Sequence, residues 1–240
     1  MLRDAEVARL AARNAHDRAT TRLRIGYMPA SLPGRVPLAL RRLAAGMANV
    51  VTSMEPGDGV ELIEAVRTER LDAAVISLPA PTAGLRTTPL PDERAVAAFP
   101  VGNRHAVSSA IRLDQLVPEQ IVVLPRETNR PFYDAVVATC RDAGLSPTFI
   151  EMADGHVEPT LLAVASGAGM ALMPASVAER YLAPGIRFVP LDGHNPTVAM
   201  AVVTRRDTTH LPTAAFLRAV SKADASHSLL ASEPTLPAAA

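Results

Sequence analysis

Glycines, hydroxyls and charged side chains gather at four points where an apolar, strand-like run of the sequence passes into a helical stripe. In a parallel sheet such turns meet at the carboxyl edge of the strands, and the helices that follow direct their first N–H groups into the crevice there. A small anion, above all a carboxylate, can be held at such an edge without a metal. The candidate ligand-binding residues are Ala30, Ser31, Gly57, Asp58, Gly59, Arg126, Thr128, Asn129, Arg130, Phe132 and His156.

Side-chain chemistry suggests three roles within this set. We expect Ser31 and Thr128 to donate hydrogen bonds through their hydroxyls. Arg126 and Arg130 would supply positive charge, and Phe132 would form an apolar wall. Each of these residues also has an ordinary structural interpretation as a helix cap, a turn residue or a solvated side chain, and the sequence alone does not decide between the two.

The sequence lacks the common catalytic and metal-binding motifs. It has no phosphate-binding loop and no G-x-S-x-G motif, and its six histidines are scattered without the spacing of a zinc site. Gly167 and Gly169 form a G-x-G, but they follow a helix and precede a strand, which is the reverse of the dinucleotide-binding order. Cys140, the single cysteine, lies on the apolar side of a predicted helix as a buried, inert thiol. We therefore predict no catalytic residue, no metal and no cofactor.

The elements that position these turns follow from apolar periodicity, which alternates between strand-like runs and helical stripes. A first βαβαβ unit has strands at 23–28, 49–54 and 71–78 and helices at 35–48 and 58–70. After two short extended segments at 85–90 and 94–101, a second unit has strands at 121–125, 147–152 and 170–174 and helices at 129–143 and 158–168. A helix at 175–181, strands at 186–191 and 197–204 and a helix at 213–223 follow. The pattern predicts an α/β fold with two Rossmann-like lobes joined by two crossover strands.

Composition limits the functional classes. The chain has 240 residues and 48% hydrophobic residues, enough for one large domain or two small ones. Its 24 basic and 24 acidic residues balance, so it lacks the excess positive charge of nucleic-acid binders. One cysteine excludes a disulfide framework and favours a reducing compartment, the cytoplasm. No stretch reaches the about 18 apolar residues of a membrane span, and the charged N-terminus lacks the apolar run of a secretory signal.

From about Leu23 to Val220 the sequence resembles the effector-binding domain of LysR-type transcriptional regulators. No single segment is specific, but their order and spacing together are. They are LRIGYM, AVRTERLDAAV, LRTTPLPDERAVAAFP, LVPEQIVVLP, CRDAGLSPTF, LLAVASGAGMALMPASV and GIRFVPLD. The Pro131–Phe132 pair and the overall spacing look most like the branch that senses intermediates of aromatic-compound breakdown.

The resemblance implies a periplasmic-binding-protein-like fold with an effector, here a small organic acid, between the lobes. Lobe I would comprise 22–98 and 191–225, and lobe II 99–190 with the crossover strands. Phe99, Pro100, Val101 and Val189 would form the hinge. Residues 1–21 resemble the end of a linker helix, and 226–240 look like a flexible tail. The family also implies a homodimer or higher oligomer.

Several features depart from the family pattern. Glu69 stands where a glycine is usual, and Ser77 stands where some aromatic-sensing members have an arginine, so their effector is not transferred. The 22 residues before Leu23 are too few for a helix-turn-helix, so we expect no direct DNA binding by the chain as written. Two alternatives stay open. A cleaved leader would indicate a solute-binding protein of a transport system, and turnover of a carboxylate would indicate an enzyme on a related bilobal scaffold.

Overall fold

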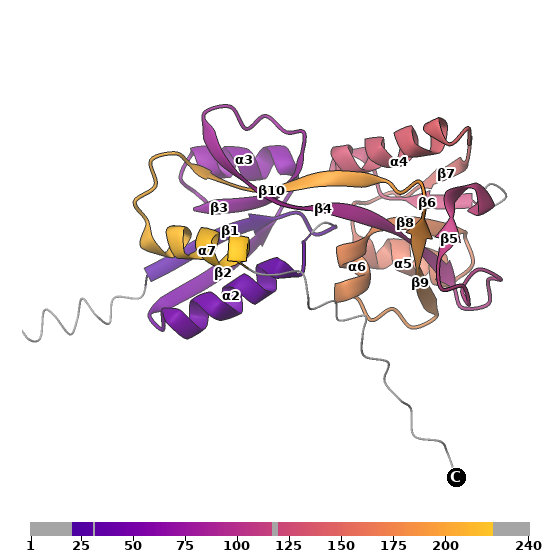
Figure 1. The fold of residues 1–240 in the computed structure, drawn as a ribbon, viewed down its shortest axis with the longest axis horizontal. Coiled ribbons are helices and arrows are strands. Elements are labelled where there is room, and N and C mark those ends of the chain that lie inside the picture. The colour runs from indigo at the N-terminus through magenta and orange to yellow at the C-terminus, as the bar shows by residue number, and fades with distance from the viewer. Residues whose placement is uncertain (1–20, 31, 117–119, 223–240) are drawn as a thin grey trace, which may run out of the picture.

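The computed structural model describes residues 21–30, 32–116 and 120–222, and it shows two α/β lobes side by side (Figure 1). Lobe I contains β1 (Thr21–Tyr27), α2 (Arg35–Gly46), β2 (Val50–Pro56), α3 (Gly59–Arg67), β3 (Ala73–Leu78), β10 (Thr197–Arg205) and α7 (Leu211–Lys222). Lobe II contains β5 (Ile111–Arg112), η1 (Leu113–Leu116), β6 (Gln120–Val123), η2 (Arg126–Thr128), α4 (Arg130–Asp142), β7 (Thr148–Glu151), α5 (Val157–Ala165), β8 (Met170–Pro174), α6 (Ala175–Arg180) and β9 (Ile186–Asp192). The predicted α/β class and the two-lobe architecture are confirmed. Of the predicted linker-helix end at 1–21, residues 1–20 lie outside the described residues and Thr21 is the first residue of β1. Ser31 and the predicted tail at 226–240 also lie outside the described residues.

One strand, β4 (Leu85–Pro100), belongs to both lobes. The strand order along the main path is β2-β1-β3-β10-β4-β8-β6-β7, and β9 pairs with β4 and β5. Within each lobe the strands of the βαβαβ unit are parallel, whereas β4 and β10 run antiparallel to their neighbours. The two lobes are therefore connected through hydrogen-bonded strands.

The change of lobe along β4 occurs between Arg94 and Ala95. Arg94 is the last residue of β4 to pair with β10, opposite Thr197, and Ala95 is the first to pair with β8, opposite Pro174. Asn195, in the returning segment, fixes this point, because its Oδ1 accepts from the Ala95 N–H at 2.9 Å and its Nδ2 donates to the Ala95 carbonyl at 3.2 Å.

The residues predicted as a hinge lie beyond that point, inside lobe II. Phe99 and Pro100 of β4 pair with β9, and Val189 of β9 pairs with Ala97. The Val101 N–H donates to the Gly185 carbonyl at 2.9 Å. The apolar run that suggested a crossover at this place is the buried ladder of β4 and β9. We therefore place the proposed hinge at 94–95 and 193–196.

The prediction of two short extended segments at 85–90 and 94–101 is wrong, because β4 is continuous over 16 residues. Pro89, near the end of the first segment, and Pro91, between the two segments, suggested a break. In the structure, however, Leu90 pairs with Met200 and Glu93 pairs with Val198. Between these two pairs β4 has one residue more than β10, so the pairing shifts there. A bulge of this kind leaves one residue unpaired and so accommodates Pro91, which has no N–H to donate.

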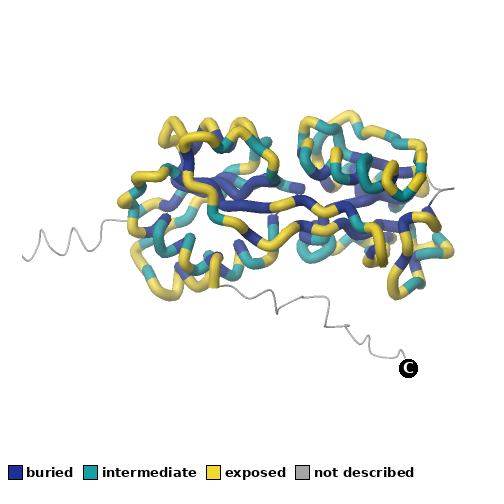
Figure 2. The backbone as a smooth tube through the Cα atoms, turned by 45° about the horizontal axis from the view of Figure 1, so that its top comes forward, coloured by how far each residue is buried: buried dark blue, intermediate teal, exposed yellow. Residues whose placement is uncertain are grey.

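Alternating side chains of the strands divide the core into two layers in each lobe. Val75 of β3 belongs to the cluster with α2 and α7, whereas its neighbours Ala74 and Ile76 belong to the cluster with α3. In lobe II, Ile121 faces α4 and Val122 faces α5. This period of two places one layer of helices on each face of each sheet. Figure 2 shows the resulting pattern, with buried strands between helices whose outer surfaces are exposed.

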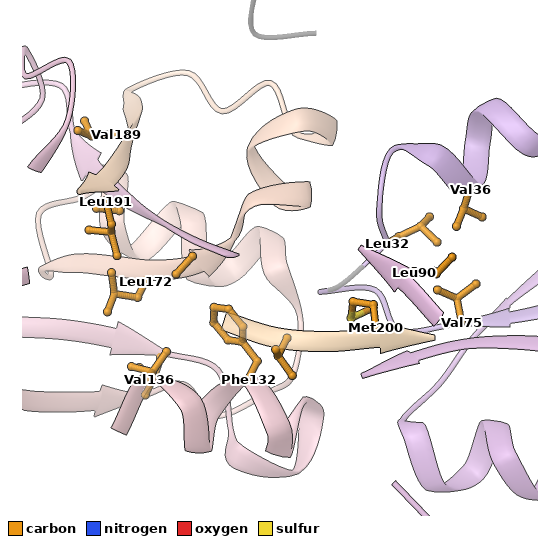
Figure 3. Close-up of a cluster of buried hydrophobic side chains, with 14 of the residues drawn as sticks. Leu32, Val36, Val75, Leu90, Phe132, Val136, Leu172, Val189, Leu191 and Met200 are labelled. Atoms are coloured by element: carbon orange, nitrogen blue, oxygen red, sulfur yellow. The ribbon is translucent and has the colours of Figure 1, made fainter. Parts of the chain in front are cut away.

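The cluster on the α4 face extends from one lobe to the other. Figure 3 shows Phe132 and Leu172 of lobe II and Met200 and Val75 of lobe I as parts of this buried group. The core is thus shared by the two lobes, and α4 reaches the strands of lobe I.

No helix in the described part of the chain combines the length and the hydropathy that a membrane span requires.

Candidate ligand site between the lobes

A cavity of about 440 Å³ lies between the lobes, and we call it the inter-lobe pocket. Lobe I contributes the ends of β1 and β3 and the start of α3, and lobe II contributes η2 and the first turn of α4. The lining residues are Met28, Asp58, Gly59, Val60, Ser77, Pro79, Ala80, Pro81, Glu127, Arg130, Pro131 and Asp134. Three predicted residues, Asp58, Gly59 and Arg130, therefore meet in one pocket from opposite lobes.

A second hollow, which we call the apolar pocket, lies on the other face of the first turns of α4. It takes up the predicted residues Ala30, Asn129 and Phe132, together with Met173 and Pro174 at the end of β8. Its free volume is about 30 Å³, room for about one water molecule. Of these two pockets at the lobe boundary, the inter-lobe pocket therefore has the larger free volume.

Two of the first amides of α3 are already bound by the side chain of its N-cap. Asp58 is its N-cap, and the Asp58 Oδ1 accepts hydrogen bonds from the N–H groups of Val60 at 2.8 Å and Glu61 at 2.9 Å. The predicted cap is confirmed, and because of it this end of the pocket carries a carboxylate. Asn129 plays the same capping role at α4, where its Oδ1 accepts from the Phe132 N–H at 3.3 Å.

Arg126 is neutralised by a carboxylate of its own lobe. Its Nε and Nη2 donate to the two oxygens of Asp134 at 2.6 and 2.7 Å. These hydrogen bonds, against a smaller opposing effect of burial, hold the pKa of Asp134 below its ordinary value. The Arg130 guanidinium, by contrast, makes no ion pair with any described residue and lines the pocket. Arg130 is therefore the cation with which an anionic ligand can pair.

Four other predicted residues line neither pocket. The Gly57 N–H donates to the Tyr27 carbonyl at 3.1 Å and so joins β2 to β1. Thr128 packs against Gly155, where a β-carbon would come within 2.4 Å of the Thr128 Oγ1. His156 is exposed at the start of α5, and Arg126 is held by Asp134 as described.

Several lining residues were not predicted, above all Ser77 and the prolines that follow β3. Ser77 is 2% exposed, its N–H donates to the Met28 Sδ at 3.4 Å, and its hydroxyl donates to the Met200 Sδ at 3.3 Å. The signal was available, since β3 ends at the same sheet edge as β1 and β2. Within the described part of the chain no three His, Cys, Asp or Glu side chains gather as a metal site requires.

Comparisons with known proteins agree with this architecture. The family model described as LysR substrate binding domain matches residues 16–225. A probable hydrogen peroxide-inducible genes activator of Mycobacterium leprae is 28% identical over 156 residues, which are 65% of this chain and 50% of that protein. The chain spans about half the length of the curated relatives it matches first.

Solved structures show the same fold at low sequence identity. CbnR, a LysR family transcriptional regulator, superposes with a TM-score of 0.76 at 20% identity, covering 92% of this chain and 74% of that one. The BenM effector binding domain with its effector benzoate gives a TM-score of 0.72 at 22% identity, covering 84% and 90%. From the family match over most of its length, we conclude that the chain belongs to the LysR substrate binding domain family.

Proposed function

We propose that this chain is the effector-sensing domain of a LysR-type transcriptional regulator and that it binds a small organic acid in the inter-lobe pocket. The observation that carries the proposal is a pocket of about 440 Å³ with one wall from each lobe. This volume lies within the range of about 300–1,000 Å³ that small-molecule sites occupy. A ligand that touches both walls favours one arrangement of the lobes over others, which is the requirement for signalling by a population shift.

The charges around the pocket support a ligand with one negative group and a largely neutral remainder. Arg130 is the cation of the lining, whereas Asp58, Glu127 and Asp134 are acidic. Asp134 is already paired with Arg126, so the carboxylates of Asp58 and Glu127 are the groups that disfavour a second negative charge on the ligand. Met28, Val60 and the prolines 79 and 81 supply the apolar surface. We propose a monocarboxylate whose charge lies beside Arg130 and whose apolar part contacts lobe I.

We expect Arg130→Ala to weaken carboxylate binding by about 1.5–3 kcal/mol, the usual range for a hydrogen bond to a charged group, or roughly tenfold or more in Kd. The ligands to be tested are a panel of aromatic and aliphatic acids that begins with benzoate, and benzamide serves as the uncharged analogue of benzoate. Isothermal titration calorimetry measures the Kd of each. The control is Arg141→Ala, at the far end of α4, where the side chain is 77% exposed. If no acid in the panel raises the Tm of the unmodified protein, the proposal of an organic-acid ligand is wrong.

A peroxide-sensing role, suggested by the names of several relatives, has little support in this chain. Sensor thiols are accessible and have a lowered pKa, because the thiolate is the reactive form. Cys140 is the single cysteine, it is 2% exposed in the core beneath α4, and burial raises its pKa.

We therefore expect Cys140 to react with Ellman's reagent and with hydrogen peroxide only as fast as the protein unfolds. The measurement is the absorbance of released thionitrobenzoate in native buffer and in urea, with an Arg141→Cys, Cys140→Ala variant as the exposed comparison. Rapid, complete reaction of native Cys140 would revive the thiol-sensing alternative.

The oligomeric state and the lack of DNA binding stay predictions. A homodimer or higher oligomer is the state that we propose, in line with the family resemblance. We expect no salt-sensitive DNA binding by this chain, since its basic and acidic residues balance.

A further inference from the structure

Helix α6 of lobe II makes a second contact with lobe I, apart from the inter-lobe pocket. Arg180 at its end donates from Nη2 to the carbonyl of Pro29 at 2.8 Å, and Ser176 near its start accepts at Oγ from the Leu32 N–H at 3.2 Å. Pro29 and Leu32 belong to the turn between β1 and α2 in lobe I. Two hydrogen bonds thus join residues about 150 positions apart in the sequence and located in different lobes.

The Arg180 guanidinium is half-buried. Burial lowers its pKa, and the negative charges of Glu93 and Glu179 oppose this effect in part, although neither forms an ion pair with it in the described part of the chain. Its Nε donates to the Ser176 carbonyl at 3.0 Å, so the cation is held by one carbonyl from each lobe. Removing a hydrogen bond from a charge that is shielded from water destabilises the protein. If the lobes moved apart here, Arg180 would lose its hydrogen bond to Pro29, so this contact favours the present spacing of the lobes.

Glu93 links helix α6 to β4, the strand that the two lobes share, through a hydrogen bond. Its carboxylate is 5% exposed, burial raises its pKa, and it accepts from the Ser176 N–H at 2.8 Å. Glu93 lies in β4 just before the point at which that strand changes lobe. Ser176 therefore contacts the β1–α2 turn through its hydroxyl and β4 through its amide.

The turn held by Arg180 is also a wall of both pockets. Met28 lines the inter-lobe pocket and Ala30 lines the apolar pocket, so the Pro29 carbonyl lies between two lining residues. On the other side, Met173 and Pro174 of the apolar pocket directly precede α6. A displacement of this wall therefore changes the distance between Arg180 and its acceptor.

We propose that Glu93, Ser176 and Arg180 form an inter-lobe junction that sets the resting orientation of the lobes, with Arg180 as the residue that positions the pocket wall. The link between this junction and ligand binding rests on the function proposed above. The junction itself does not, because its hydrogen bonds join protein groups only.

The test measures the distance between the lobes without any ligand. Spin labels on cysteines at Arg41 of α2 and Leu162 of α5, both exposed, report the distance by double electron–electron resonance. A Cys140→Ala background leaves only these two thiols. Arg180→Met keeps the length of the stem but removes every donor, and Ser176→Ala removes only the hydroxyl that accepts from Leu32.

We expect both variants to give a broader distance distribution with a shifted mean, and the amide of Leu32 to exchange faster with deuterium in Ser176→Ala. Arg187→Met, an exposed arginine of β9, is the matched control and should keep the original distribution. Far-UV circular dichroism verifies folding, and if Arg180→Met does not fold, Ser176→Ala decides. Distributions identical to that of the unmodified protein would overturn the junction. Absence of carboxylate binding would overturn the proposed function while leaving these distances unaffected.

Discussion

Gly169→Ala is expected to lower the free energy of unfolding by about 2–6 kcal/mol, the combined range of backbone strain and overpacking. Gly169 has a φ of +153°, and a β-carbon there would lie 2.4 Å from the carbonyl oxygen of Gln120. That oxygen belongs to the backbone of β6, which is paired with β8, so it cannot move away as a flexible side chain would. Urea denaturation followed by circular dichroism measures the loss.

Gly167→Ala is the matched control from the same turn. Gly167 has a φ of +89°, but its β-carbon would meet nothing within 4 Å, so only the left-handed conformation is penalised, at about 1–2 kcal/mol. Equal losses for the two variants would mean that the close approach to β6 is not the cause. The G-x-G of the sequence thus has a structural explanation in this turn.

Phe99→Ala is expected to cost about 3–5 kcal/mol, as is usual for a fully buried phenylalanine. Phe99 is completely buried, packs in the shared core, and contacts the ring of His105 in a tilted arrangement, with centroids 5.6 Å apart. Phe99→Leu keeps most of the volume and should cost less than about 1.5 kcal/mol. Thermal and urea unfolding of the two variants test this directly.

The same pair of variants tests the earlier hinge assignment. If Phe99 were a hinge residue, Phe99→Ala would change the orientation of the lobes with little loss of stability. A large stability loss in Phe99→Ala with an unchanged lobe distance in Phe99→Leu is the result expected of a core residue. The opposite pattern would return the hinge to this part of β4.

The elements of the fold could be predicted because each sheet is covered on both faces. Buried parallel strands have nearly continuous apolar runs, such as that of β3, and the helices between them show stripes such as that of α2. The exception was β4, in which prolines suggested two segments. Local sequence does not show that a proline lies in a bulge, because the bulge is defined by the partner strand, here β10.

The site was predictable only in its location. The rule that strand-to-helix turns meet at one edge predicts that Asp58 and Arg130 lie near each other, and both line the inter-lobe pocket. Which charges are already paired depends on side-chain geometry: Asp58 caps its own helix, and Arg126 is bound by Asp134, eight residues away on α4. Ser77 was missed for a similar reason, since its contacts with Met28 and Met200 join three different strands or their ends.

The sharing of β4 determines how the lobes can move. A linker loop can rotate freely about a few bonds, but β4 is hydrogen-bonded to neighbours along most of its 16 residues. The two ladders meet between Arg94 and Ala95, and the returning segment at 193–196 lies outside both of them. We therefore expect reorientation of the lobes to take the form of a change in strand twist that is centred on Arg94 and Ala95 and shared with the neighbouring peptide units. Such a torsional response is small in angle and elastic, so we expect a ligand to produce graded changes in domain shape rather than a wide opening.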